Sequence, residues 1–433
     1  MTPRQFLKKY TYDDRLVTGE YFSSESLVLQ EGDRVGVVLM NLGGPDRGDD
    51  VAPFLYNLFM DPAIIDIPVG GILRHWLCRL IASRRSQHVR KDYEVIGGGS
   101  PLNRLTREQA AALEKYLMRE FGEEAGVEFK TYIAMRYWHP FSEEAAEQMR
   151  QDGINKVVLL PLYPHYSKTT TGSGLIYWYA LQEEGEIPRW DTTYVFEYST
   201  NPKYVQAVSE RIDEAIQRFP KEMRSRVHLL FSAHGTPLKE MKERRDPYCC
   251  LIHSTVERVM AQRGFDYPFH VSFQSKVGPM EWLTPSTVSK VRELVSQGVA
   301  GLVVVPIAFV SDHIETAYEL DVELRAIAEE DGLKHFEVTS GLNCHPLFIE
   351  ALAEATICQL VLPRGVGRVS SSGDGVPSGR TYPLRPLRSM PQYNPSERST
   401  RCHQCEFIIE ARRWDIPDAQ TETRPIPPER QAR

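Results

Sequence analysis

Short apolar runs rich in β-branched residues alternate with longer amphipathic runs, and this alternation constrains the fold of the chain most strongly. The apolar runs cover residues 35–42, 130–137, 157–163, 193–198, 227–234, 270–274, 302–309 and 336–339. They are continuous rather than alternating, as expected for parallel strands that are buried on both faces. Amphipathic patterns between them predict helices, the clearest at 105–121, 142–151, 202–218, 286–297 and 314–328. We therefore predict an α/β fold with parallel sheets.

The chain also resembles itself at two places. Residues 35–45 are similar to residues 227–237, an offset of 192, and residues 157–163 are similar to residues 302–308, an offset of 145. Any two buried strands look alike, but the matching Gly-x-Pro and Pro-bearing ends favour a true repeat. The offsets differ by 47, so the first half is expected to carry an insertion.

These boundaries divide the chain into regions. We predict an N-terminal extension at 1–33 and two similar Rossmann-like domains at 34–200 and 201–362. The first domain carries an insertion, called the lip here, at about 61–103. The tail at 363–433 is rich in Pro, Arg and Ser and has little apolar periodicity, so we expect it to be largely disordered.

Composition limits the class of protein. The formal net charge of −7 argues against a nucleic-acid binder. There is no run of about 18 apolar residues, so no membrane-spanning helix is expected. Residues 1–33 have a mixed charge and lack the apolar stretch of a signal peptide, which favours a cytoplasmic protein. The seven cysteines are irregularly spaced and do not predict a disulfide framework.

Polar residues stand where the predicted strands end. Ligands of parallel α/β sheets bind beyond the carboxyl ends of the strands, often between two halves. Side chains at these ends are therefore candidates for a common cleft. They are Asn41, Arg136, Tyr163, His234, Gln274, Ser311, Asp312 and His313.

Two of these strand ends carry groups suited to proton or metal chemistry. His234 stands at the end of a buried strand and precedes Gly235. An imidazole there could accept a proton or ligate Fe²⁺. Alternatively, it could have the purely structural role of capping the next helix. Glu315, Glu319 and Glu323 are spaced by four, so they would stack on one helical face. Such a ridge is either a solvated acidic face or a path for protons or a divalent cation, with Glu315 innermost and nearest to His234.

The lip contains an apolar stripe with basic flanks. Its apolar members are Ile72, Leu73, Trp76, Leu77, Leu80 and Ile81. Its basic members are Arg74, His75, Arg79, Arg84 and Arg85. The pattern fits a core-facing helix, a helix lying on an anionic membrane surface, or the wall of an apolar ligand with carboxylates.

Taken together, the motifs resemble the ferrochelatase family over residues 34–362. They are the segments 41–45, 97–101 with Tyr93, 135–137, 163–167, 232–234, 274–280 with Trp282, and 311–316. The resemblance implies the class II chelatase fold, with a porphyrin cleft between two Rossmann-like domains. It also implies insertion of Fe²⁺ into protoporphyrin IX, with release of two protons, to give protohaem in the last step of haem biosynthesis.

The resemblance also implies roles for individual residues. His234 and Glu315 match the catalytic pair and the metal contacts of the family, and Asp312, His313 and Glu319 match its metal or proton path. The matching porphyrin-binding residues are Asn41, Arg84, Arg85, Tyr93, Ser100, Arg136, Tyr163, Trp282 and Phe309. The lip at about 64–85 matches the part that meets the membrane, which would make the protein peripheral at the inner face.

The chain departs from the family pattern at its cysteines. Members with an iron–sulfur cluster of the eukaryotic type use three cysteines near the C-terminus and one at the position of Lys168, whereas this tail has two. A different [2Fe–2S] cluster on Cys344, Cys358, Cys402 and Cys405 stays open. Two rival functions also stay open, a chelatase for another tetrapyrrole or metal and a non-catalytic porphyrin carrier.

Overall fold

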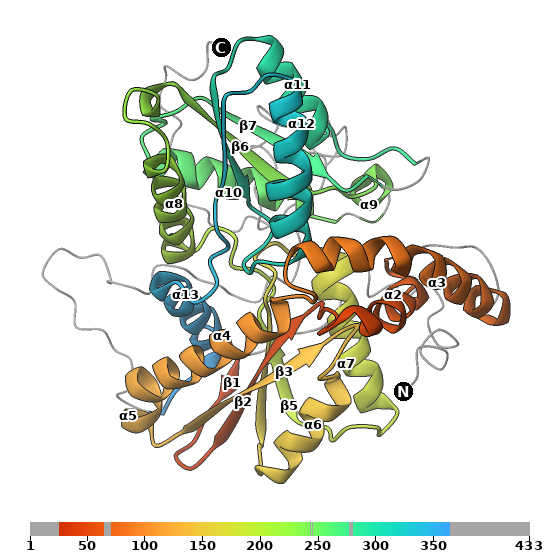
Figure 1. Ribbon diagram of the computed structural model, residues 1–433. Helices are drawn as coiled ribbons and strands as arrows, with labels where there is room; N and C mark the ends of the chain where they lie inside the picture. Colours follow the sequence, from red (N-terminus) through yellow and green to blue (C-terminus); the bar gives the residue numbers. More distant parts are fainter. Residues whose placement is uncertain (1–25, 65–70, 243, 245, 277–279, 364–433) are drawn as a thin grey trace, which may run out of the picture.

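The computed structural model describes residues 26–64, 71–242, 244, 246–276 and 280–363 (Figure 1). The predicted disorder of the tail concerns residues outside this range, apart from residue 363. Most of the predicted N-terminal extension lies outside it as well.

Eight strands form two parallel sheets of four. The first sheet has the order β3-β2-β4-β5 and the second has the order β7-β6-β8-β9. Their bounds are β2 (Arg34–Asn41), β3 (Glu128–Met135), β4 (Lys156–Pro161), β5 (Asp191–Tyr194), β6 (Val227–His234), β7 (Phe269–Gln274), β8 (Gly301–Pro306) and β9 (His335–Val338). The predicted α/β fold with parallel sheets is confirmed, because every pairing in both sheets is parallel.

The predicted repeat is visible in the register of the strands. Met40 pairs with Pro161 in the first sheet, and Ser232 pairs with Pro306 at the corresponding place in the second. These positions keep the offsets of 192 and 145 found in the sequence. The two sheets are therefore copies of one arrangement, and their strands end in the same relative positions.

Helices cover both sheets. In the first half they are η2 (Gly48–Asp50), α2 (Val51–Met60), α3 (Gly71–Val95), α4 (Leu102–Leu117), η3 (Met118–Gly122), α5 (Glu123–Ala125), α6 (Ser142–Gln151), η4 (Lys168–Gly172) and α7 (Ser173–Glu183). In the second half they are α8 (Pro202–Gln217), η5 (Arg224–Arg226), α9 (Leu238–Lys242), α10 (Tyr248–Gln262), α11 (Thr287–Ser296), η6 (Glu315–Leu324), α12 (Arg325–Glu330) and α13 (Pro346–Ile357).

Two of the predicted helices contain π-helical turns. The run at 105–121 continues from α4 into the π-helix η3 at Met118–Gly122. The run at 314–328 was expected to be a single α-helix, but Glu315–Leu324 forms the π-helix η6 and α12 begins at Arg325. A π-helix bonds residue i to i+5, and such turns occur often at functional sites. Periodicity alone did not separate the two types, because residues four apart lie near one face in both.

The last helix joins the two halves. α13 packs against both α4 and α8, and β10 (Leu360–Val361) pairs with β1 (Leu27–Val28). One hydrophobic cluster extends from Val35 in β2 through Phe348 in α13 to Phe231 in β6. Because one hydrophobic core extends through both halves, the packing does not mark a domain boundary. The predicted boundary between residues 200 and 201 therefore remains a prediction.

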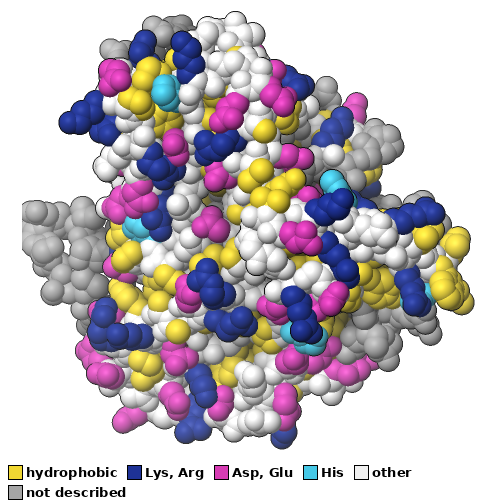
Figure 2. All heavy atoms as spheres, in the orientation of Figure 1, with side chains coloured by type: hydrophobic (Ala, Val, Ile, Leu, Met, Phe, Trp, Pro, Cys, Tyr) yellow, Lys and Arg dark blue, Asp and Glu magenta, His cyan; other side chains and the backbone are white. Residues whose placement is uncertain are grey.

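Within the described residues, the main helix of the lip is α3, and α2 lies just before the lip in the sequence. α3 packs along α2, and their cluster includes Tyr93 and also Ile314 from the second half. The outer end of α3 exposes hydrophobic side chains (Figure 2), with Ile72 81%, Leu73 61% and Trp76 59% exposed. A helix that only faced the core would not expose these residues. Among the described residues, none of the helices is both long and apolar enough to cross a membrane.

Candidate functional site

His234 and Glu315 meet where their parallel strands end. His234 is the last residue of β6, and Glu315 begins η6 shortly after β8, the neighbour of β6. The Nδ1 atom of His234 lies 2.8 Å from Oε2 of Glu315. The His234 side chain is 41% exposed and that of Glu315 is 17% exposed. The imidazole is thus open to a ligand while its carboxylate partner is shielded.

The sequence around His234 accounts for this approach. Gly235 donates its N–H to the carbonyl oxygen of Gln274 at 2.8 Å. A Cβ atom at Gly235 would lie 2.6 Å from that oxygen and 3.3 Å from the ring of Trp282. Only glycine therefore lets the end of β6 pass this close to β7 and Trp282.

The pair is electrostatically coupled. Burial lowers the pKa of His234, but the charge and hydrogen bond of Glu315 outweigh this effect, so the pKa is raised above its usual value. For Glu315, burial raises the pKa, and the opposing contacts of His234 and His313 bring it well below its usual value. Glu315 is therefore ionised at neutral pH and favours a proton on His234.

A second carboxylate lies one turn further along η6. Ser275 donates its hydroxyl to Oε2 of Glu319 at 2.9 Å, and that hydroxyl also lies 3.4 Å from Oε2 of Glu315. Burial and the charge of Glu315 raise the pKa of Glu319 to about 7. Ser275 adopts a φ of 62°, a strained conformation for a residue with a side chain, and this aims its hydroxyl at η6.

The sequence placed Gln274 among the candidates for the cleft but predicted no contact for it, and it gave no role to Ser275. The Nε2 atom of Gln274 lies 3.1 Å from Oε2 of Glu315, while its Oε1 accepts the Ser232 hydroxyl at 2.9 Å. The available signal was the place of Gln274 at a strand end. This position alone did not predict that Gln274 contacts Glu315.

The three other predicted neighbours of the pair differ in what they contact. Phe309 places its ring edge-on to His234 with centroids 6.4 Å apart and packs against His313 at 4.4 Å. The Nε2 atom of His313 lies 3.8 Å from Glu315. Asp312 instead holds its own loop, accepting hydrogen bonds from Gly341 and Asn343 at 2.9 and 2.8 Å.

The lip brings Tyr93 and Ser100 to the acidic helix. Tyr93 is buried and hydrogen-bonds Ser100. Its pKa is raised first by burial and then by the negative charges of Glu315 and Glu319, which places the phenol beside η6. The lip is therefore part of the wall around the His234 site.

Asn41, Arg136 and Tyr163 line one small cavity at the carboxyl ends of β2, β3 and β4. Nη2 of Arg136 lies 2.8 Å from Asp61, whose side chain is 1% exposed. Burial raises the pKa of Tyr163, so its phenol stays protonated. Sequence reasoning missed Asp61, because 75 residues separate it from Arg136 and no motif connects them.

Arg84 and Arg85 are not brought into this cavity. Both are exposed on α3, and the guanidinium of Arg85 lies over the ring of Phe59 at 5.7 Å. They lie on the lip helix, between its exposed apolar end and Tyr93.

The described residues contain no group of three or more His, Cys, Asp or Glu side chains arranged to hold a metal ion. Cys344 and Cys358 are partly exposed, and burial raises the pKa of Cys344, which disfavours a thiolate. Cys402 and Cys405 lie outside the described residues, so the cluster prediction is untested.

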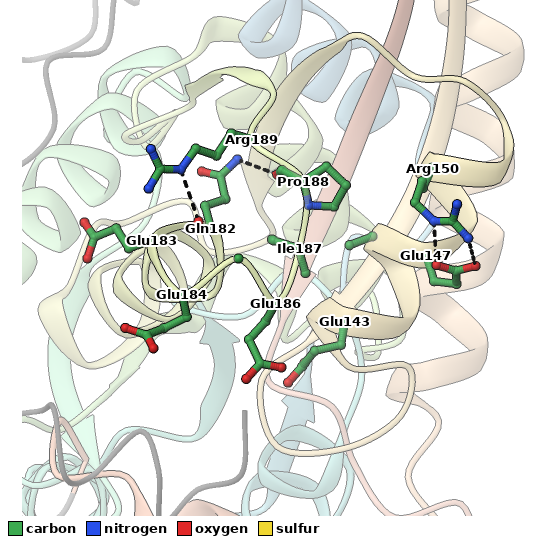
Figure 3. A pocket seen from close by; sticks show the side chains of 12 residues that line it. Glu143, Glu147, Arg150, Gln182, Glu183, Glu184, Glu186, Ile187, Pro188 and Arg189 are labelled. Carbon is green, nitrogen blue, oxygen red and sulfur yellow. Dashed lines mark hydrogen bonds and ion pairs between the residues drawn. The ribbon is translucent and has the colours of Figure 1, made fainter.

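A separate hollow lies between α6 and the end of α7 (Figure 3). Glutamates dominate its lining, and Glu147 is paired with Arg150 at 2.7 Å. It contains none of the predicted site residues and plays no part in the chemistry considered below.

The fold and the His234 site define a parallel α/β protein in which a partly exposed imidazole lies against a shielded carboxylate where parallel strands end. The ferrochelatase family model matches residues 34–360. Ferrochelatases of Trichormus variabilis and Synechococcus elongatus are each 44% identical, over 76% of this chain and 83% and 84% of theirs. The ferrochelatase of Nostoc sp. is 45% identical over 76% of this chain and 83% of its own. The chain belongs to the ferrochelatase family.

Among solved structures, the sirohydrochlorin chelatase SirB of Bacillus subtilis subspecies spizizenii, in complex with cobalt, matches with a TM-score of 0.40 at 12% identity. The match covers 75% of this chain and 95% of that one.

Proposed function

We propose that His234 and Glu315 carry out the reaction of this ferrochelatase. The reaction inserts Fe²⁺ into protoporphyrin IX to give protohaem, the last step of haem biosynthesis, and releases two protons. The observation that carries the assignment is the 2.8 Å contact between Nδ1 of His234 and Glu315 beside the ring of Phe309. Both residues would also contact the iron as it enters.

The contact supports an assignment of the nitrogen that takes the proton. An ionised carboxylate only accepts hydrogen bonds, so Nδ1 of His234 must be the donor to Glu315. Nε2 then carries the free lone pair and accepts a proton from a pyrrole N–H. Glu315 stabilises the imidazolium that results, as a buried carboxylate partner does in other histidine sites.

The protons leave along η6. Ser275 lies within 3.4 Å of Glu315 and 2.9 Å of Glu319, so its hydroxyl can relay a proton between the two carboxylates. Glu319, with a pKa of about 7, can take up and release a proton near neutral pH. Glu323, exposed at the next turn, passes it to solvent. His313 supports Glu315, whereas Asp312 contributes through the shape of its loop.

The porphyrin is held by the remaining predicted residues. Tyr93 and Ser100 of the lip, and Trp282 and Phe309 beside His234, supply flat and apolar contacts. Asn41, Arg136 and Tyr163 form the opposite polar wall, and Arg84 and Arg85 are available to carboxylates from α3. Binding energy from these contacts holds the ring bent, so that the nitrogen lone pairs become accessible to iron.

The exposed end of α3 makes a peripheral membrane contact at the inner face of the membrane. Ile72, Leu73 and Trp76 would enter the interface, while Arg79 faces anionic headgroups. This arrangement agrees with a cytoplasmic protein that receives an apolar porphyrin from the membrane.

A [2Fe–2S] cluster on Cys344, Cys358, Cys402 and Cys405 is a separate proposal. Visible charge-transfer absorption by the isolated protein would support it.

The function is tested by anaerobic Fe²⁺ insertion into protoporphyrin IX and coproporphyrin III, followed by the absorbance of the product. Faster insertion into protoporphyrin supports the proposal. Preference for coproporphyrin would indicate another chelatase, and tight binding without insertion would indicate a carrier.

A further inference from the structure

Asp61 is a buried carboxylate that the proposed reaction does not use. It follows α2, and four groups surround it. Oδ1 accepts the N–H of Ala63 at 2.8 Å, and Oδ2 accepts the hydroxyls of Tyr137 at 2.7 Å and Ser173 at 2.6 Å. The fourth is Arg136, whose Nη2 lies 2.8 Å from Oδ2. Arg136 thus places an opposite charge directly against this buried carboxylate.

Arg136 is held equally firmly. Its Nε donates to the Ser173 hydroxyl at 3.1 Å, and its guanidinium lies over the rings of Tyr177 at 4.2 Å and Tyr137 at 5.1 Å. Its side chain is 13% exposed and lines the cavity that contains Asn41 and Tyr163. The cation that faces the ligand on this wall is therefore already neutralised from behind by Asp61.

This arrangement changes what the wall can bind. A carboxylate placed beside a free guanidinium is attracted, but beside a neutral Arg–Asp pair the two charges largely cancel. A porphyrin with two carboxylates can place both at other parts of the cleft. A porphyrin with four has carboxylates on all sides, so at least one has to lie near the Arg136–Asp61 pair, where attraction by Arg136 is weakened.

We propose that Asp61 determines porphyrin specificity, by cancelling the charge of Arg136 and so disfavouring porphyrins with four carboxylates. The inference rests on the proposed role of this cavity in porphyrin binding. Asp61 acts only through Arg136 and touches no reacting atom, so it is a specificity-determining residue and not a catalytic one.

A charge series tests this proposal. The pair has no net charge in the wild type, +1 in Asp61→Asn, −1 in Arg136→Gln, and none in the double variant. The readout is the ratio of kcat/KM for coproporphyrin III to that for protoporphyrin IX. We expect the ratio to rise about fivefold in Asp61→Asn, to fall in Arg136→Gln, and to return to within about twofold of the wild type in the double variant.

A purely structural role gives a different pattern. Loss of a buried hydrogen-bond network lowers activity toward both porphyrins together and leaves the double variant worse than either single variant. An unchanged ratio in Asp61→Asn, or a double variant that fails to recover, overturns the proposal. If Asp61→Asn does not fold, the fall in Arg136→Gln and the recovery in the double variant still decide the question.

The test of the role of Asp61 can fail independently of the test of the proposed function. Binding of the two metal-free porphyrins, followed by quenching of their fluorescence, gives the ratio of their affinities without turnover. A wild type that inserts no iron overturns the proposed function. A binding ratio that does not follow the charge of the pair overturns the role of Asp61 while leaving iron insertion intact.

Discussion

Glu315 and Glu319 lie one turn apart on η6 and are joined through the Ser275 hydroxyl, which is 3.4 Å from the first carboxylate and 2.9 Å from the second. Their pKa values move in opposite directions. That of Glu315 is held low by His234 and His313 against the effect of burial, and that of Glu319 is raised to about 7 by burial and by Glu315. The inner carboxylate is therefore ionised in the resting protein at neutral pH, and the outer one can exchange protons.

The first prediction concerns the rate of proton release. Glu319→Gln removes the exchangeable group, so kcat for iron insertion should fall about tenfold. In the wild type, kcat should rise with pH through about 7 as Glu319 loses its proton, and the variant should have a shallower profile there. Glu329→Gln, an exposed change on α12, serves as the control. Equal pH profiles for Glu319→Gln and the wild type would exclude Glu319 from the path.

The second prediction concerns stability. Because folding raises the pKa of Glu319, the folded state holds its proton more tightly than the unfolded state. The stability contributed in this way is complete below the usual carboxyl pKa and is lost as pH rises to about 7. Glu319→Gln should therefore be more stable than the wild type by about 1–3 kcal/mol at pH 8, and by much less near pH 5. Urea denaturation at the two pH values measures this, and a gain independent of pH would contradict it.

The third prediction concerns a buried ion pair between η4 and α9. Lys168 has a fully buried side chain, and its Nζ lies 2.5 Å from Glu240. Lys168→Met leaves the Glu240 carboxylate with Arg244 at 3.1 Å, and we expect a loss of about 3 kcal/mol. Lys156→Met, which breaks a surface pair with Asp191, should cost less than about 1 kcal/mol. Similar losses in the two variants, measured by urea denaturation, would show that burial does not set the strength of the Lys168 pair.

The fourth prediction concerns the membrane. Trp76→Glu places a charge among the exposed apolar side chains of α3, so binding to anionic vesicles should fall severalfold in a sedimentation assay. Val361→Glu alters a similarly exposed apolar residue on β10 and should bind as the wild type does. Unchanged sedimentation of Trp76→Glu would remove the case for this contact surface.

Much of the fold followed from the sequence because it depends on local patterns. Continuous Val- and Leu-rich runs such as 302–309 predicted buried parallel strands, and the helix at Ser142–Gln151 was placed with its observed bounds. The contact of α13 with α4 could not be predicted in this way. It depends on how the chain returns across both halves after β9, and no local pattern records that path.

The same contrast between local patterns and long-range contacts holds at the site. His234 and Glu315 stood out because polar groups at the ends of buried strands are unusual, and the structure brings them into contact. Neutralisation of Arg136 by Asp61 was invisible, since it depends on where α2 ends relative to β3. The strained backbone of Ser275 was hidden for a similar reason, because a positive φ outside glycine has no reliable signal in sequence.

The most direct test of the central claim is anaerobic Fe²⁺ insertion into protoporphyrin IX by His234→Ala, with His228→Ala as the matched control on the same strand. We predict that His234→Ala binds metal-free porphyrin but inserts iron at least about 100-fold more slowly than the wild type, while His228→Ala stays within about twofold. Insertion by His234→Ala within about twofold of the wild type would contradict the assignment of His234 as the proton acceptor.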